Sequence, residues 1–305
     1  MALPRRRFLQ LCASASLVPG SVFASPVHEP YLWEGTGMGG DISITLDGFS
    51  NLSAERLVSM AKQELTRLES IFSLYDDSSA LSLLNRKGYL EEPPPELLQM
   101  LDLSADLFSQ TRGAFDPAVM SPVEQSAFSR RKWSQIKWDR ESIKLPQDTE
   151  ITLNGIAQGY TTDRICQLFS AAGASHTLVN LGEYRATGPK IDGNPWIVGL
   201  RDPSALWRVN SHVPLINGAI ATSSNATPLG AHILDPETHA PPNHFKSVSV
   251  TAPSATLADG LSTALFVLPL EQAIDVVTLN EQTGAQFTMR DDQIRSYGFW
   301  PKYEI

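Results

Sequence analysis

Apolar residues recur at intervals of three and four along several stretches of the chain, and this spacing predicts amphipathic helices. In the first stretch, Leu57, Leu65 and Leu68 fall on one face. Prolines at 93–95 precede the second stretch, and proline is well placed in the first turn of a helix. Helices are therefore expected at residues 53–72, after residue 95, at 160–172, from near 254 to 266, and at 270–277.

Shorter stretches alternate between polar and apolar residues or are rich in strand-forming residues, which predicts strands. They lie at residues 41–46, 177–180, 196–200, 213–220, 247–251, 286–289 and 294–297. Helices and strands mix without strict βαβ order, and the sequence has no internal repeat. We therefore expect an α+β fold in a single compact unit with two lobes.

Composition and charge exclude some classes of function. The chain has 305 residues, of which 42% are hydrophobic and 19% are charged, as is typical of a globular protein. Its formal net charge is -9. So acidic a chain is poorly suited to neutralise a phosphate backbone, and we exclude nucleic acid as a partner.

The N-terminus has the three parts of an export signal: basic residues, an apolar stretch at 9–18 and a small residue, Ala24. The order Arg5-Arg6-Arg7-Phe8-Leu9 resembles a twin-arginine signal. A general secretory signal with one extra arginine is the alternative, and a lipid anchor at Cys12 is disfavoured by the bulky Leu11 before it.

We therefore expect a signal peptide at residues 1–24, a functional domain at 25–305 and a periplasmic location. Outside the signal, no apolar run is long enough to span a membrane, so no stable membrane span is expected after signal cleavage. Cleavage would also leave Cys166 as the remaining cysteine, which excludes an internal disulfide or a thiolate metal cluster. Cys166 lies in an apolar helical pattern and is expected to be a small core residue.

Residues 153–160 form the densest candidate motif, Leu-Asn-Gly-Ile-Ala-Gln-Gly-Tyr, at a predicted junction between a loop and a helix. Glycine lets the backbone approach a ligand closely, and the first amides of a helix lack intrahelical partners. Together with the helix dipole they favour an anion such as phosphate. A purely structural turn before a helix is the alternative.

Asp259 and Thr263 lie four residues apart on a predicted helix and so face the same way. A carboxylate and a hydroxyl are hard oxygen donors that suit Mg²⁺, which completes its shell with water and phosphate oxygens. A capping or surface pair is the alternative.

Three further features are weaker on their own. His232 precedes an Asp-Pro turn and could act as a base or contact a substrate, although a satisfied histidine beside a turn is the simpler interpretation. Residues 113–117 are a turn by default, and Tyr75 is by default a core aromatic at a helix end.

Taken in chain order, these motifs resemble the FAD:protein FMN transferase family, often called the ApbE family, from about residue 35 to 266. The matching segments are Met38-Gly39-Gly40, Phe72-Ser73-Leu74-Tyr75, residues 81–85, Gly113-Ala114-Phe115-Asp116-Pro117, Gly155-Ile156-Ala157, Gly159-Tyr160, Asp163-Arg164, residues 199–203, Ala221-Thr222-Ser223, residues 232–236 and residues 258–264. Chance agreement of so many motifs in one order is negligible.

The resemblance implies an enzyme that binds FAD and Mg²⁺, moves FMN onto a Ser or Thr hydroxyl of an exported or membrane-anchored acceptor flavoprotein, and releases AMP. It implies metal ligation by Asp259, Thr263 and the carbonyl of Ala157. It places Met38 and Tyr75 along the flavin, with Tyr75 stacked on it. It makes His232 a general base, beside a catalytic Asp259. The implied remainder of the FAD site is Asp116, Gly155, Ile156, Gln158, Gly182 and Glu183.

The sequence also departs from the common family pattern. Thr152, Asn154 and Gln158 stand where Asp, Gly and Lys are usual, and Glu183 stands where a second Gly is usual. The change at Gln158 removes a positive charge near the phosphates. Two alternatives therefore stay open: an FAD-binding protein without transferase activity, and an FAD pyrophosphatase that gives FMN and AMP.

Overall fold

A computed structural model describes residues 29–120, 132–226 and 232–302 of the chain. The expected signal peptide at residues 1–24 lies outside the described residues. Within them, no helix combines the length and the apolar character needed to cross a bilayer.

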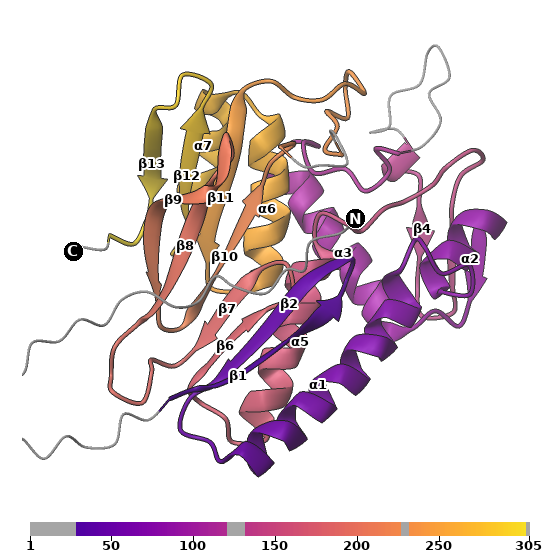
Figure 1. Ribbon diagram of the computed structural model, residues 1–305. Coiled ribbons are helices and arrows are strands. Elements are labelled where there is room, and N and C mark those ends of the chain that lie inside the picture. Colours follow the sequence, from indigo (N-terminus) through magenta and orange to yellow (C-terminus); the bar gives the residue numbers. More distant parts are fainter. Residues whose placement is uncertain (1–28, 121–131, 227–231, 303–305) are drawn as a thin grey trace, which may run out of the picture.

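An antiparallel sheet organises the described part of the chain (Figure 1). Its eight strands lie in the order β1-β2-β6-β7-β10-β11-β12-β13, and every neighbouring pair is antiparallel. The strands are β1 (Tyr31–Gly37), β2 (Gly40–Leu46), β6 (Thr177–Asn180), β7 (Tyr184–Thr187), β10 (Gly218–Ser223), β11 (Phe245–Ala252), β12 (Gly284–Met289) and β13 (Ile294–Gly298).

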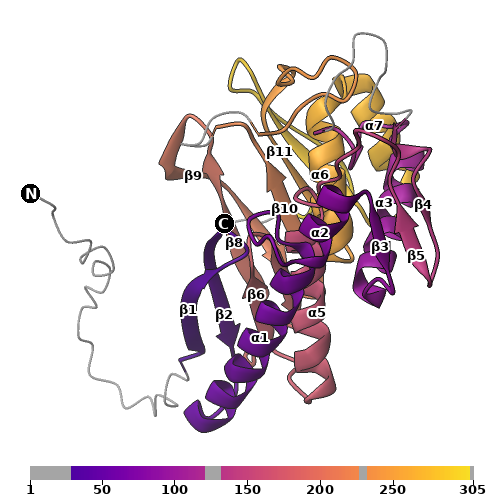
Figure 2. The same ribbon diagram turned by 90° about the vertical axis from the view of Figure 1, so that its right-hand side faces the viewer.

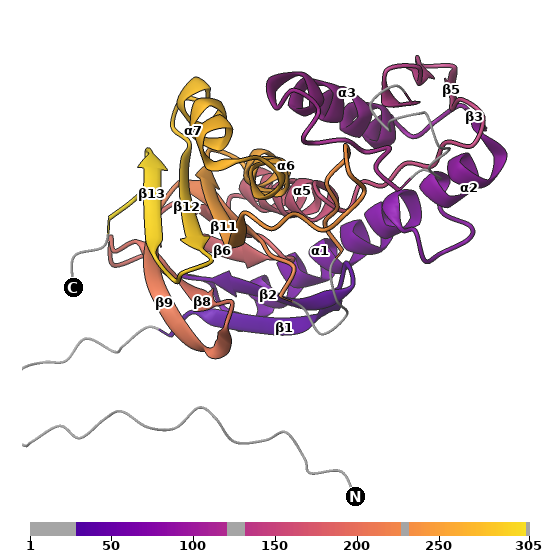
Figure 3. The ribbon, with the colours of Figure 1, turned by 90° about the horizontal axis from the view of Figure 1, so that it is seen from above.

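Helices cover one face of this sheet, and a hairpin covers part of the other (Figure 3). The covering helices are α1 (Asn51–Phe72), α5 (Ala157–Ala171), α6 (Ala255–Val267) and α7 (Leu270–Leu279). The hairpin pairs β8 (Trp196–Asp202) with β9 (Ala205–Leu215), and its Trp196 and Val213 share a buried cluster with Ile220 of β10. The central helices α5 and α6 are thus enclosed between the sheet and the remaining helices.

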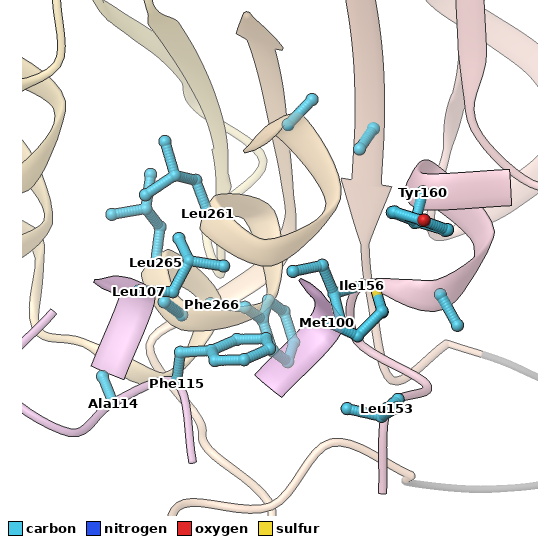
Figure 4. Close-up of a cluster of buried hydrophobic side chains, with 14 of the residues drawn as sticks. Met100, Leu107, Ala114, Phe115, Leu153, Ile156, Tyr160, Leu261, Leu265 and Phe266 are labelled. Carbon is cyan, nitrogen blue, oxygen red and sulfur yellow. The ribbon is translucent and has the colours of Figure 1, made fainter. Parts of the chain in front are cut away.

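A second lobe lies beyond the end of α1 (Figure 2). It contains α2 (Ala80–Lys87), α3 (Pro95–Gln110) and a small sheet of β3 (Tyr89–Glu91), β4 (Lys137–Trp138) and β5 (Ser142–Lys144). One hydrophobic core joins both lobes, and Figure 4 shows the part where Leu261 and Phe266 of α6 meet Leu107 and Phe115. The predicted α+β unit with two lobes is confirmed.

Most predicted elements form, and local capping explains where they start. Ser50 caps α1 by accepting the Ser53 N–H at 3.3 Å, and Ser254 caps α6 by accepting the Leu257 N–H at 3.2 Å. Pro95 lies in the first turn of α3, as predicted. Cys166 is a buried core residue as expected, and burial raises the pKa of its thiol to about 12.

Two boundary predictions are wrong. Residues 213–220 are not one strand, because β9 ends at Leu215 and β10 begins at Gly218 after a tight turn. Helix α5 begins at Ala157 rather than near residue 160, so Gly159 lies inside the helix instead of before it. The elements β1, α2, β3, β4, β5 and β7 were not predicted.

Candidate active site

The site is built where α5 crosses α6 at Gly159. The Gly159 N–H donates to Oδ2 of Asp259 at 2.9 Å, and Asp259 is buried. A Cβ at Gly159 would overlap the Ala255 carbonyl oxygen and lie 2.8 Å from the Asp259 Cβ. The absence of a side chain on Gly159 therefore lets the two helices approach closely enough for this hydrogen bond.

Thr263 faces the loop that leads into α5. Its hydroxyl is 3.4 Å from the carbonyl oxygen of Gly155, and it is also 3.4 Å from the hydroxyl of Ser223 at the end of β10. Ser223 in turn contacts the Ser262 hydroxyl at 2.8 Å. The prediction that Asp259 and Thr263 share one face of a helix is therefore confirmed, and that face meets the motif at residues 155–159.

A second carboxylate, Glu183, lies in the β6–β7 turn beside this pair. It is buried, and its Oε2 accepts the Thr222 N–H at 3.2 Å. Burial and the nearby charge of Asp259 raise the pKa of Glu183 well above its ordinary value. Burial also raises the pKa of Asp259 to about 7, with the Gly159 N–H opposing that rise and the Asp163 charge adding to it. A bound cation would favour the ionised forms of both carboxyl groups and so offset this rise.

Gln158, Met38 and Gly182 meet on the neighbouring side of α5. The Gln158 side-chain amide donates to the Met38 carbonyl at 3.1 Å, and a Cβ on Gly182 would lie 2.6 Å from the Gln158 Cδ. Met38 lies in the β1–β2 turn with a φ of 49°, where residues other than glycine are uncommon. Its N–H is held by Glu69 at 2.8 Å. Backbone strain of this kind is concentrated at functional sites.

The structure brings Asp116 and Ile156 to the same region. Asp116 is buried, its Oδ1 accepts the Ala118 N–H at 2.8 Å, and the adjacent Phe115 ring packs against Gly155. Ile156 is fully buried in the core below the motif, where Figure 4 labels it. Its side chain therefore supports the loop, and any contact to a ligand would come from its backbone.

Tyr75 is not a core aromatic, which corrects the default interpretation. The residue is 91% exposed in the turn between α1 and α2, where the Ser73 hydroxyl accepts the N–H groups of Tyr75 and Asp76 at 3.1 Å each. His232 is also exposed, and its N–H donates to Asn225 at 3.1 Å. Asn225 thereby ties the His232 segment to the end of β10, two residues after Ser223.

The expectation of free amides at the start of α5 is wrong in part. The Ala157 N–H donates to the Leu153 carbonyl at 2.8 Å, and the Gly159 N–H is taken by Asp259. Because these donors are already used, the N-terminus of α5 is a weaker anion site than its sequence indicates. A cation held by the carboxylate is the better supported way to attract phosphate here.

Mg²⁺ fits the donors that converge at this crossing. The described residues contain no group of three or more His, Cys, Asp or Glu side chains placed to hold a metal ion. Mg²⁺, however, is often held by one or two carboxylates plus substrate phosphates and water. Asp259 and Thr263 supply a carboxylate and a hydroxyl, and the carbonyl beside Thr263 is that of Gly155. Ligation by the Ala157 carbonyl stays a prediction.

Two cavities lie apart from the Asp259–Thr263 pair. A groove of about 610 Å³ runs between β1 and α1 and is lined by Trp33, Val58 and Lys62 among others. A smaller one of about 250 Å³ lies beside Asn225 and includes Lys246 and Phe266. The site is therefore recognised from its converging polar groups rather than from cavity size.

The raised pKa of Asp259 predicts an unusual pH dependence in metal-free protein. Between the ordinary value of 3.8 and about 7, the folded state keeps a proton that the unfolded state releases. The contribution of Asp259 to the free energy of unfolding should therefore be largest below that range and fall as the pH rises through about 7. Urea unfolding of the wild type and of Asp259→Asn with a chelator present, at pH values from about 4 to 8, isolates this contribution. The variant should lack this fall, and the same pH dependence in both proteins would contradict the assignment.

Fold and site together define a class of protein: a mixed helix–sheet protein whose buried acidic and hydroxyl groups meet between two helices, at a place suited to a cation and a phosphate ligand. A model of the ApbE family matches residues 38–287, and the chain belongs to this family. The family assignment made from the motifs is thus confirmed.

Curated relatives and solved structures agree with this assignment. The chain is 27% identical to the FAD:protein FMN transferase of Haemophilus influenzae, over 77% of this chain and 79% of the relative. It is also 27% identical to that of Klebsiella pneumoniae, over 83% of each chain. The flavin transferase ApbE from Vibrio cholerae has the same fold, with a TM-score of 0.74 at 23% identity, over 88% of this chain and 97% of the other.

Several residues of the site were not singled out from the sequence. Ser223 and Asp163 lie within the motifs that match the family, but no role was assigned to them from the sequence. Glu69 lies in no motif that could have indicated it. Each acts through a partner distant in sequence: Ser223 is 40 residues from Thr263, and Glu69 is 31 residues from Met38.

Proposed function

We propose that this chain is an enzyme that transfers FMN from FAD to a hydroxyl of a Ser or Thr side chain in an acceptor protein. The observation that carries the proposal is the convergence of Asp259 and Thr263 on the Gly155–Gly159 segment, in a member of a family whose curated relatives are FAD:protein FMN transferases. FAD is then a substrate rather than a resident cofactor.

The reaction replaces the phosphoanhydride bond of the FAD pyrophosphate with a phosphoester bond to the acceptor. The acceptor oxygen attacks the phosphorus on the FMN side of the pyrophosphate, the bond to the bridging oxygen breaks, and AMP leaves with that oxygen. The acceptor proton passes to a base, for which His232 is the candidate. Such transfers depend mainly on positioning and charge neutralisation. Asp259, Thr263 and the carbonyl of Ala157 would hold Mg²⁺, which supplies neutralisation of pyrophosphate charge.

The other predicted residues hold the substrate. One continuous surface beside α5 is formed by Gln158, Gly182 and Met38, because Gln158 contacts the other two. The exposed Tyr75 ring is free to stack on a planar ligand. The bond from Gln158 to Met38 also gives Gln158 a defined role without a positive charge. The loss of the usual lysine is therefore compatible with an ordered site.

Tyr75→Ala should weaken FAD binding by roughly 1–3 kcal/mol, because a stacked aromatic ring would be lost. Tyr75→Phe keeps the ring and should bind FAD like the wild type. Quenching of flavin fluorescence on titration measures both affinities. Phe299→Ala, which removes another exposed ring (71%) outside the site, is the matched control. Equal affinities for Tyr75→Ala and wild type would exclude Tyr75 from the flavin site.

The experiment that tests the function measures both products, AMP and the modified acceptor, in the same reaction mixture. The purified chain is incubated with FAD, Mg²⁺ and an acceptor flavoprotein fragment, and AMP is measured by chromatography while the acceptor is weighed by mass spectrometry. A mass gain equal to FMN with equimolar AMP supports the transferase. AMP without a mass gain indicates the pyrophosphatase, and tight FAD binding without either product, across several acceptors, indicates a binding protein.

We also propose that residues 1–24 direct export to the periplasm and that the acceptor is an exported or membrane-anchored flavoprotein. The twin-arginine-like order of residues 5–9 motivates this proposal. N-terminal sequencing of the protein recovered from the periplasmic fraction tests it, and recovery of uncleaved protein from the cytoplasm alone would overturn it.

A further inference from the structure

Asp163 is a buried carboxylate to which the proposed function gives no role, and both of its oxygens accept hydrogen bonds. It lies on α5, one turn after Gly159. Its Oδ1 accepts the Ala255 N–H at 2.9 Å, and its Oδ2 accepts the N–H of Thr256 at 2.9 Å and the Thr256 hydroxyl at 2.5 Å. The Arg185 guanidinium of β7 pairs with the same carboxylate.

These contacts mean that hydrogen bonds join α5 and α6 at two points. Gly159 holds Asp259, and Asp163 holds the first residues of α6, which lie one turn before Asp259. A helix cannot rotate or slide while two points one turn apart are both fixed. A shift of α6 by a single residue would turn Asp259 by about 100° away from Gly159.

We propose that Asp163 is a positioning residue, which fixes the register of α6 on α5 so that Asp259 and Thr263 face the Gly155–Gly159 segment. This proposal rests on the proposed function in one respect: the proposed function makes this face of α6 the reactive one. Asp163 also connects a third element, because Arg185 lies two residues after Glu183 on β7. Asp163 thus connects α5, which carries Gln158, with α6, which carries Asp259, and with β7, which directly follows Glu183.

The alternative is a carboxylate that stabilises the end of a helix and has no effect on the site. A matched control separates the two. Asp202 is also buried, accepts the Ser204 N–H at 2.7 Å and the Arg208 Nε–H at 2.9 Å, and lies on the β8–β9 hairpin. Each of the variants Asp163→Asn and Asp202→Asn therefore removes one buried, hydrogen-bonded negative charge. The first removes it at the crossing of α5 and α6, and the second removes it away from that crossing.

The test reads the position of α6 directly. Hydrogen exchange at the Gly159 amide reports the bond to Asp259 without any need for activity or metal. We expect exchange at Gly159 to accelerate at least tenfold in metal-free Asp163→Asn, relative to its neighbours on α5, and to stay unchanged in Asp202→Asn. We also expect the Mg²⁺ concentration for half-maximal FMN transfer to rise at least tenfold in Asp163→Asn alone.

Wild-type exchange at Gly159 in folded Asp163→Asn would overturn the proposal, whatever the melting temperature of that variant. If Asp163→Asn does not fold, Thr256→Val and Thr256→Ser provide the test. The first removes the hydroxyl bond to Asp163 and should accelerate exchange at Gly159, whereas the second keeps it and should behave as wild type. Equal exchange in these two variants would also overturn it. If the wild type transfers no FMN, the proposed function fails, and exchange at Gly159 still decides the role of Asp163.

Discussion

Asp259→Asn is expected to lower Mg²⁺-dependent FMN transfer by roughly 10³-fold, which corresponds to about 4 kcal/mol of lost charge stabilisation. Asn has nearly the same shape, and its side chain can still accept the Gly159 N–H that Asp259 accepts at 2.9 Å. The fold should therefore persist. Metal-free protein near pH 8 should even gain stability, because burial opposes the charge of Asp259 and an amide carries none.

Steady-state transfer at several Mg²⁺ concentrations, together with thermal unfolding of the same samples, checks this result. Thr263 supplies the matched pair of controls. Thr263→Ser keeps the hydroxyl and should retain most of the activity, whereas Thr263→Val keeps the shape without the hydroxyl and should lose it. Full activity in Asp259→Asn would remove the metal site from this helix crossing.

Gly159→Ala is expected to have the largest effect on stability, about 3 kcal/mol or more. The new methyl group would overlap the Ala255 carbonyl and lie 2.7 Å from its carbon, so backbone rather than a flexible side chain would have to move. The close approach of α5 and α6 would then be lost, together with the hydrogen bond to Asp259. Transfer activity should fall even in the fraction that remains folded.

Denaturant unfolding measures this cost, and Gly40→Ala is its control. A Cβ at Gly40 would meet nothing within 4 Å, so that variant should unfold within about 1 kcal/mol of the wild type. A Gly159→Ala protein as stable and as active as Gly40→Ala would show that the helices can separate without consequence.

Local spacing predicted the parts of the fold and site that depend on one helix or strand. The four-residue interval between Asp259 and Thr263 was enough to place both on one face of α6. The edge strand β1 escaped prediction because it carries two glycines and alternates only weakly, and α2 escaped because it has just two buried residues, Leu81 and Leu84.

Contacts between distant segments could not be predicted in this way. Asp163 lies 92 residues from Ala255, so nothing in either neighbourhood reveals the bond between them. Tyr75 illustrates the opposite error: its apolar neighbours indicated a core residue, but the turn after α1 directs the ring into solvent. Which of these residues belong to one site was predicted from the resemblance to a family and not from spacing.

The left-handed backbone at Met38 has a consequence for how this sequence can change. A glycine there would relieve backbone strain of order 1 kcal/mol, but it would also remove a side chain that packs against two hydrophobic clusters. The same side chain is expected along the flavin. Packing and substrate affinity therefore both favour a large apolar residue at Met38, and a library selected for transfer should retain one there despite the left-handed backbone.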